Sequence, residues 1–139
     1  EKWSGETARR RASSPKLLVY NTALCTALSD TAGAPPGGDP VRRGRLVEAA
    51  VGARLANAMA AGECELYYWL DRNREVDFVV KARGGLTAIE VKSGRARGSF
   101  PGLAAFREAY KPRRTLVVGG DGIPLETFLT KPVEHWVAP

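Results

Sequence analysis

Three strand-like segments separated by very short turns constrain the fold more than any other part of this sequence. Residues 65–70 and 74–81 are separated by Asp71-Arg72-Asn73, and residues 86–92 follow the turn Arg83-Gly84-Gly85. Turns this short join neighbouring antiparallel strands, whereas a parallel connection needs a dozen or more residues. The sequence therefore predicts an antiparallel meander of three strands.

Helices and a further strand are predicted on either side of this meander. A segment rich in Ala, Leu, Arg and Glu predicts a helix over 41–60, which Gly62 ends. A second helix is expected over 103–110, and residues 114–118 are expected to form a strand parallel to the third through a right-handed crossover. The fold class is therefore α/β, with a mixed β-sheet flanked by helices. Four shorter elements are also expected: strands at 16–20 and 133–137, and helical turns at 23–28 and 124–129.

The length of 139 residues predicts a single domain over 1–139. Residues 1–14 form a basic, polar end that is expected to be solvated or frayed, and residues 31–40 form a Pro- and Gly-rich loop. The chain does not begin with Met, which predicts a processed chain or a fragment of a longer one.

Composition excludes several classes of protein. No apolar run approaches the roughly 20 residues of a membrane-spanning helix, so no membrane partner is expected. Cys25 and Cys64 lack CxxC spacing and are interpreted as reduced core residues of a cytoplasmic protein. With 21 Lys and Arg against 15 Asp and Glu, the net charge of +6 fits a polyanionic partner such as DNA or an acidic protein surface.

The strand over 74–81 carries acidic residues within a run of valines. Side chains alternate between the two faces of a strand, so Glu75 and Asp77 are expected on one face. The other face is expected to hold Val76, Phe78 and Val80. Glu75 itself is interpreted as a helper or as the ion-pair partner of Arg74.

The next strand adds an acid and a base, Glu90 and Lys92, which are flanked by Ile89 and Val91. If the two strands pair in register, Asp77, Glu90 and Lys92 gather at one end of a sheet face. A divalent cation relieves the repulsion between close carboxylates, and oxygen ligands favour Mg²⁺ or Mn²⁺. Asp77 and Glu90 are therefore the predicted metal ligands, with Lys92 activating a water or stabilising a phosphoryl transition state. A solvated ladder of ion pairs is the alternative.

The long helix contributes a further carboxylate. Glu48 falls on the same helical stripe as Val51, Gly52, Leu55 and Met59, which are apolar or small. A carboxylate in that position is costly unless it has a partner. Glu48 is expected either to pair with an arginine or to reach the metal cluster.

The order Glu48, Asp77 and Glu90-x-Lys92 on helix, strand and strand resembles the signature of the PD-(D/E)xK nuclease superfamily. More closely, the chain resembles the domain of unknown function that follows the ATPase core of bacterial and archaeal AAA-type ATPases. The matching segments are SPKLLVYNTAL (14–24), GRLVE (44–48), LYYWL (66–70), REVDF (74–78), IEVKS (89–93) and the helix over 103–110. Asn21 and Ala23 replace the usual Asp and Gly of the first segment, outside the metal constellation.

This resemblance implies a restriction-endonuclease-like core within a longer AAA-type ATPase, and an ATPase core in the same parent chain. It implies hydrolysis of DNA phosphodiester bonds with Mg²⁺ or Mn²⁺, with Glu48, Asp77, Glu90 and Lys92 as the catalytic set. A catalytically inactive module that binds nucleic acid or protein and regulates the ATPase is the alternative. Arg95 and Arg97, after the third strand, are candidate DNA-phosphate contacts or part of a solvated loop. The sequence is compatible with a monomer or an oligomer.

Overall fold

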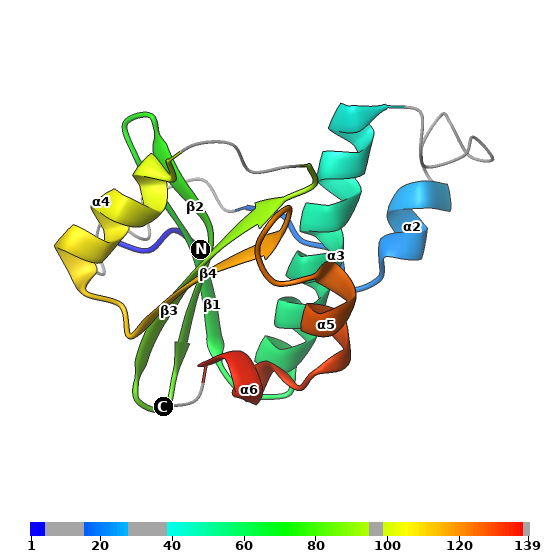
Figure 1. Ribbon diagram of the computed structural model, residues 1–139. Helices are drawn as coiled ribbons and strands as arrows, with labels where there is room; N and C mark the ends of the chain where they lie inside the picture. Colours follow the sequence, from blue (N-terminus) through cyan, green and yellow to red (C-terminus); the bar gives the residue numbers. More distant parts are fainter. Residues whose placement is uncertain (5–15, 28–38, 95–98, 138–139) are drawn as a thin grey trace.

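A four-stranded mixed sheet lies at the centre of the protein and carries helices on both faces (Figure 1). The computed structural model describes residues 1–4, 16–27, 39–94 and 99–137. Strands β1 (Glu65–Asp71), β2 (Arg74–Ala82) and β3 (Gly85–Lys92) form the predicted antiparallel meander. Strand β4 (Arg114–Gly119) pairs with β3 in parallel, as predicted, and the sheet order is β1-β2-β3-β4. The α/β class is confirmed.

Helix α3 (Pro40–Ala60) covers one face of the sheet, and α4 (Pro101–Tyr110) covers the other (Figure 1). The side chain of Asp39 caps α3 by accepting a hydrogen bond from the N–H of Val41 at 2.9 Å. The last residues of the predicted 31–40 loop therefore form the beginning of this helix. Gly62 follows the last turn with a φ of +78°, a conformation that glycine adopts without strain. Three short helices complete the described elements: α2 (Thr22–Ala27), α5 (Leu125–Thr130) and α6 (Val133–Val137).

Each face of the sheet has its own apolar core. The core on the α3 side also receives α5 and α6, and its largest buried side chains include Val51, Leu55, Phe78, Val80, Ile89 and Phe128. The core on the α4 side contains Tyr67, Trp69, Val76, Val79, Leu103 and Phe106. The sheet is thus apolar on both faces, which is why its strands carry valine runs rather than a simple polar–apolar alternation.

A β-bulge in β2 corrects one predicted face. Tyr67 pairs with Val79 and Trp69 pairs with Val76, so two steps along β1 oppose three along β2. The extra residue puts Val76 in the α4-side core, although alternation had placed it with Phe78. Bulges re-aim side chains, and this one contains Asp77 itself.

The predicted strand at 133–137 is wrong, because these residues form helix α6. Val133, Trp136 and Val137 are buried, a spacing typical of one helix face, while the residues between them are exposed. The indole of Trp136 stacks on Phe128 with ring centroids 5.3 Å apart. A five-residue apolar run does not by itself distinguish a strand from a helical turn.

The N-terminal predictions also need correction. Residues 16–20 are not a strand; Leu18 packs against the α3-side core while Leu17 is exposed. Residues 1–4 are not frayed, because the N–H of Trp3 donates to the Tyr68 carbonyl at 2.6 Å. The rest of the 1–14 segment and most of the 31–40 loop lie outside the described residues.

No helix in the described part of the chain is both long enough and apolar enough to cross a bilayer.

Candidate functional site

The candidate site lies where β2 and β3 stop pairing. Their ladder runs from Ala82–Gly85 to Phe78–Ile89, while β3 continues to pair with β4 as far as Lys92–Gly119. Beyond the ladder, the Asp77 carboxylate takes the place of a backbone acceptor, and its Oδ2 accepts the N–H of Val91 at 2.8 Å. This bond satisfies a backbone donor that the separating strands would otherwise leave unpaired. It also fixes Asp77 between the two strands.

Asp77 is half-buried among other acidic groups. Burial raises the pKa of its carboxyl to about 6, the hydrogen bond from Val91 opposes this rise, and the nearby charges of Glu90 and Glu48 add to it. Like charges that share a site disfavour ionisation, and a cation placed among them relieves the cost. The carboxylates of Asp77, Glu90 and Glu48 therefore form one electrostatic cluster.

Glu90 and Lys92 form an ion pair on β3. Lys92 Nζ lies 2.7 Å from Glu90 Oε1, and the Glu90 side chain is only 13% exposed. The other carboxylate oxygen, Glu90 Oε2, is buried and has no hydrogen-bond partner in the described structure. Burial lowers the pKa of Lys92, but the bond to Glu90 and the charges of Asp77 and Glu48 outweigh this effect and leave it raised. Oε2 therefore keeps its lone pairs available as an acceptor, although the Lys92 ammonium pairs with the other oxygen of the same carboxylate.

Glu48 takes a partner that the sequence did not indicate. It pairs with Lys16 Nζ at 2.5 Å, not with an arginine. The same ammonium lies 3.7 Å from Glu75 Oε1 and 5.2 Å from the centre of the Phe78 ring. The only sequence signal for Lys16 was a single cation at the start of an apolar segment, which does not reveal a partner on a distant helix.

The four predicted site residues lie within electrostatic reach of one another, because the charges of Glu48, Asp77 and Glu90 all act on Lys92. Glu75 faces Lys16, and Arg74 pairs instead with Asp71 at 2.6 Å, so the predicted Arg74–Glu75 pair is wrong. Arg95 and Arg97 lie outside the described residues.

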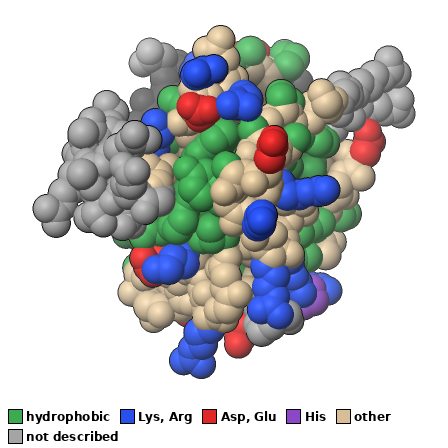
Figure 2. All heavy atoms as spheres, turned by 90° about the vertical axis from the view of Figure 1, so that its left-hand side faces the viewer, with side chains coloured by type: hydrophobic (Ala, Val, Ile, Leu, Met, Phe, Trp, Pro, Cys, Tyr) green, Lys and Arg blue, Asp and Glu red, His purple; other side chains and the backbone are tan. Residues whose placement is uncertain are grey.

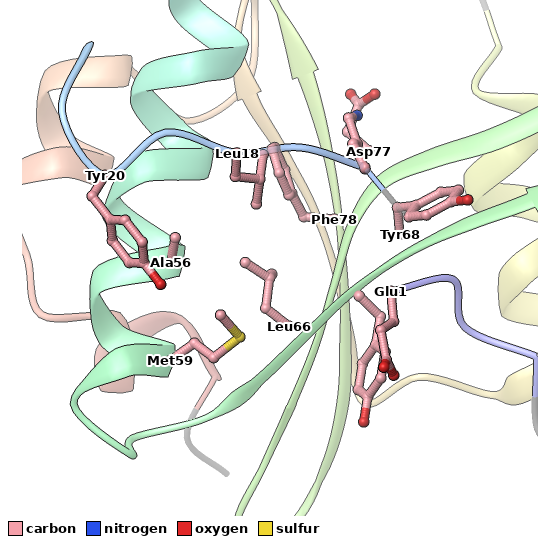
Figure 3. A pocket seen from close by; sticks show the side chains of 11 residues that line it. Glu1, Leu18, Tyr20, Ala56, Met59, Leu66, Tyr68, Asp77 and Phe78 are labelled. Atoms are coloured by element: carbon pink, nitrogen blue, oxygen red, sulfur yellow. The ribbon is translucent and has the colours of Figure 1, made fainter. Parts of the chain in front are cut away.

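A cavity of about 200 Å³ opens beside the cluster (Figure 3). Lys16 and Asp77 are among the residues that line it, and Figure 3 shows Asp77 well apart from Tyr20 and Met59. Phe78 and Leu66 form part of its apolar wall. Of the acidic cluster, Asp77 therefore borders a partly apolar hollow.

The donor set fits a hard divalent cation. The described residues contain no group of three or more His, Cys, Asp and Glu side chains arranged to hold a metal. Mg²⁺, however, commonly binds through one or two carboxylates and completes its shell with water and substrate phosphate. Asp77 and Glu90 supply two such carboxylates, and the buried Glu90 Oε2 has no hydrogen-bond partner among the described residues.

A comparison with protein-family models matches residues 43–129 to a domain of unknown function, DUF4143. This match covers more than half of the 139 residues. The chain belongs to the DUF4143 family. The DUF4143 match includes Glu48, Asp77, Glu90 and Lys92, while Lys16 precedes it. No curated protein and no solved structure matches the chain.

Proposed function

We propose that this chain is a metal-dependent nuclease-like domain that hydrolyses phosphodiester bonds in DNA. The observation that carries the proposal is the buried, unpartnered Glu90 Oε2, which lies in one electrostatic cluster with Asp77 and Lys92 where β2 and β3 separate. A core ion-pair network would satisfy both oxygens of a buried carboxylate, since an unsatisfied one is costly.

Each residue takes a distinct part in this proposal. Asp77 and Glu90 would hold Mg²⁺ or Mn²⁺, which when bound would polarise the phosphate and the attacking water. Lys92, whose ammonium pairs with Glu90, would act as a hydrogen-bond donor. It would orient the water or stabilise charge on a phosphate oxygen. In the reaction the water oxygen bonds to phosphorus, one P–O bond breaks, and the leaving oxygen takes a proton.

The charge of the protein supports DNA as the substrate class. The net charge is +6, and basic side chains border an apolar area on the face that carries α4 (Figure 2). Arg107, Lys111 and Arg113 are exposed on this helix or just after it. Such charges attract a polyanion irrespective of its sequence. The contacts predicted for Arg95 and Arg97 would add to this attraction.

The sequence resemblance supports the same class of reaction. Glu48 on α3, Asp77 on β2 and Glu90-x-Lys92 on β3 follow the order of the PD-(D/E)xK signature. On the same basis we propose that the parent chain is an AAA-type ATPase and that this domain follows its ATPase core.

A second candidate is a catalytically inactive module that binds nucleic acid or protein and regulates the ATPase. Two ion pairs favour it, Lys16–Glu48 and Lys92–Glu90, because they partly neutralise the acidic cluster without a metal. Under this alternative the cluster is structural, and neither Mg²⁺ nor Mn²⁺ changes the stability of the fold.

A cleavage assay on labelled single-stranded, duplex and branched DNA separates these candidates. Wild type, Glu90→Gln and Lys92→Gln would be compared in Mn²⁺, Mg²⁺ and EDTA. The matched control is Lys81→Gln, which removes a lysine from a similar 2.6 Å ion pair with Glu65 at the exposed end of β2. We expect metal-dependent cleavage that both site variants lose and the control retains.

A melting assay with added Mn²⁺ completes the test, because a ligand that binds only the folded state raises its stability. A shift in the melting temperature that Glu90→Gln abolishes supports the metal site even without cleavage. Absence of both cleavage and shift would overturn the nuclease proposal and favour the inactive module.

A further inference from the structure

Lys16 is a second lysine whose ammonium lies among the carboxylates of the candidate site. Its ammonium pairs with Glu48 at 2.5 Å, lies 3.7 Å from Glu75, and is close enough to Asp77 for the two charges to interact. Lys92, by comparison, has one ion pair, with Glu90. Lys16 therefore stands among three carboxylates that come from α3 and β2.

The position of Lys16 relates directly to the cavity. The lysine and Asp77 both line the hollow, and the ammonium lies 5.2 Å from the centre of the Phe78 ring, which also lines it. The Lys16 side chain keeps 26% of its surface exposed, and that of Glu48 keeps 36%. The pair can thus separate without opening the core, unlike an ion pair buried beneath a helix.

We propose that Lys16 is a built-in counter-cation that holds Glu48 in the metal-free protein and competes with the divalent cation for the carboxylate cluster. This inference rests on the proposed function, since it assumes a metal at Asp77 and Glu90. It gives a role to the ion pair by which the third carboxylate of the cluster, Glu48, contacts an ammonium from outside the helix. It also assigns the protein a resting state in which the site is neutralised from within.

The electrostatic consequence has a definite sign. Removing the Lys16 charge leaves Glu48 and Asp77 without their positive neighbour, so the cluster attracts an added cation more strongly. We expect Lys16→Gln to bind Mn²⁺ about tenfold more tightly than wild type. Lys16→Arg keeps the charge and is expected to bind Mn²⁺ within about threefold of wild type.

Calorimetric titration with MnCl₂ in the absence of nucleic acid tests this expectation. The proteins compared are wild type, Lys16→Gln, Lys16→Arg, Glu90→Gln and the exposed control Lys81→Gln. Tighter binding by Lys16→Gln alone supports the proposal, as does binding by Lys16→Gln where wild type binds too weakly to detect. Equal or weaker binding by Lys16→Gln, with clear binding by wild type, overturns the role of Lys16 and leaves the metal site standing. No binding by any protein overturns both.

A measurement on the wild-type protein avoids dependence on how well the variants fold. Lysine labelling by a small amine-reactive reagent, read by mass spectrometry, reports whether an ammonium is engaged. We expect Mn²⁺ to increase labelling of Lys16 by severalfold and to leave Lys81, in its pair with Glu65, unchanged. Unchanged or reduced labelling of Lys16 in the presence of bound Mn²⁺ would overturn the proposal.

Discussion

The Asp77→Asn substitution should stabilise the metal-free protein at neutral pH. The change removes the charge of a half-buried carboxyl but keeps an oxygen that can accept the N–H of Val91, now 2.8 Å from Asp77 Oδ2. In the folded protein the pKa of Asp77 is raised from its ordinary 3.8 to about 6, chiefly by burial and against the bond from Val91. The native state therefore resists ionisation of this group more than the unfolded chain does.

The size of the effect follows from that pKa. At about 1.4 kcal/mol for each tenfold change in acidity, the rise from 3.8 to about 6 corresponds to about 3 kcal/mol. A group whose folded pKa is raised contributes stability below its unfolded pKa and loses it as pH rises through the folded value. Because the carboxyl keeps some contact with solvent, we expect the free energy of unfolding of Asp77→Asn to exceed that of wild type by roughly 1–3 kcal/mol near pH 7. Near pH 4 we expect the two values to differ little.

Urea unfolding in EDTA, followed near pH 4, pH 5.5 and pH 7, measures this difference. The matched control is Glu75→Gln, which removes an exposed carboxylate two residues away on the same strand. The control should change the free energy of unfolding by less than about 0.5 kcal/mol at each pH. A difference between Asp77→Asn and wild type that stays constant with pH, or that favours wild type near pH 7, would refute the reasoning.

Three further predictions concern the framework that holds the site, and urea denaturation checks each. Gly102→Ala should lower the free energy of unfolding by roughly 2–3 kcal/mol, because the new Cβ would overlap the carbonyl oxygen of Glu75. The control Gly62→Ala, where nothing lies within 4 Å of the new Cβ, should lower it by only about 1 kcal/mol through its positive φ. Equal losses in the two variants would contradict this prediction. Phe78→Ala should cost roughly 3–5 kcal/mol, since this ring is among the largest fully buried side chains, and a loss below about 1 kcal/mol would show that the core can collapse around the gap. Asp39→Ala should cost about 1 kcal/mol through the lost N-cap of α3, and Asp39→Asn should restore most of it.

Much of the fold could be predicted because the signals were local. Turn lengths alone predicted that β1, β2 and β3 are antiparallel neighbours, and the helix expected over 103–110 predicted that β4 returns in parallel. Alternation put Glu90 and Lys92 on one face of the strand, where they pair with each other, while Ile89 and Val91 lie in the α3-side core. The prediction for the short segment 133–137 was wrong, because five residues are too few for a periodic pattern to distinguish a helix from a strand.

For the candidate site too, some features followed from the sequence and others from the tertiary structure. The sequence by itself determined which chemical groups are present and that Asp77, Glu90 and Lys92 lie near one end of adjacent strands, because strand pairing across a short turn leaves little freedom. Only the tertiary structure decided the bulge that puts Val76 and Phe78 in different cores, the bond from Val91 that anchors Asp77, and the pairing of Glu48 with Lys16. These depend on packing between elements distant in sequence, where the contact that wins is set by burial and charge in three dimensions and not by any local pattern.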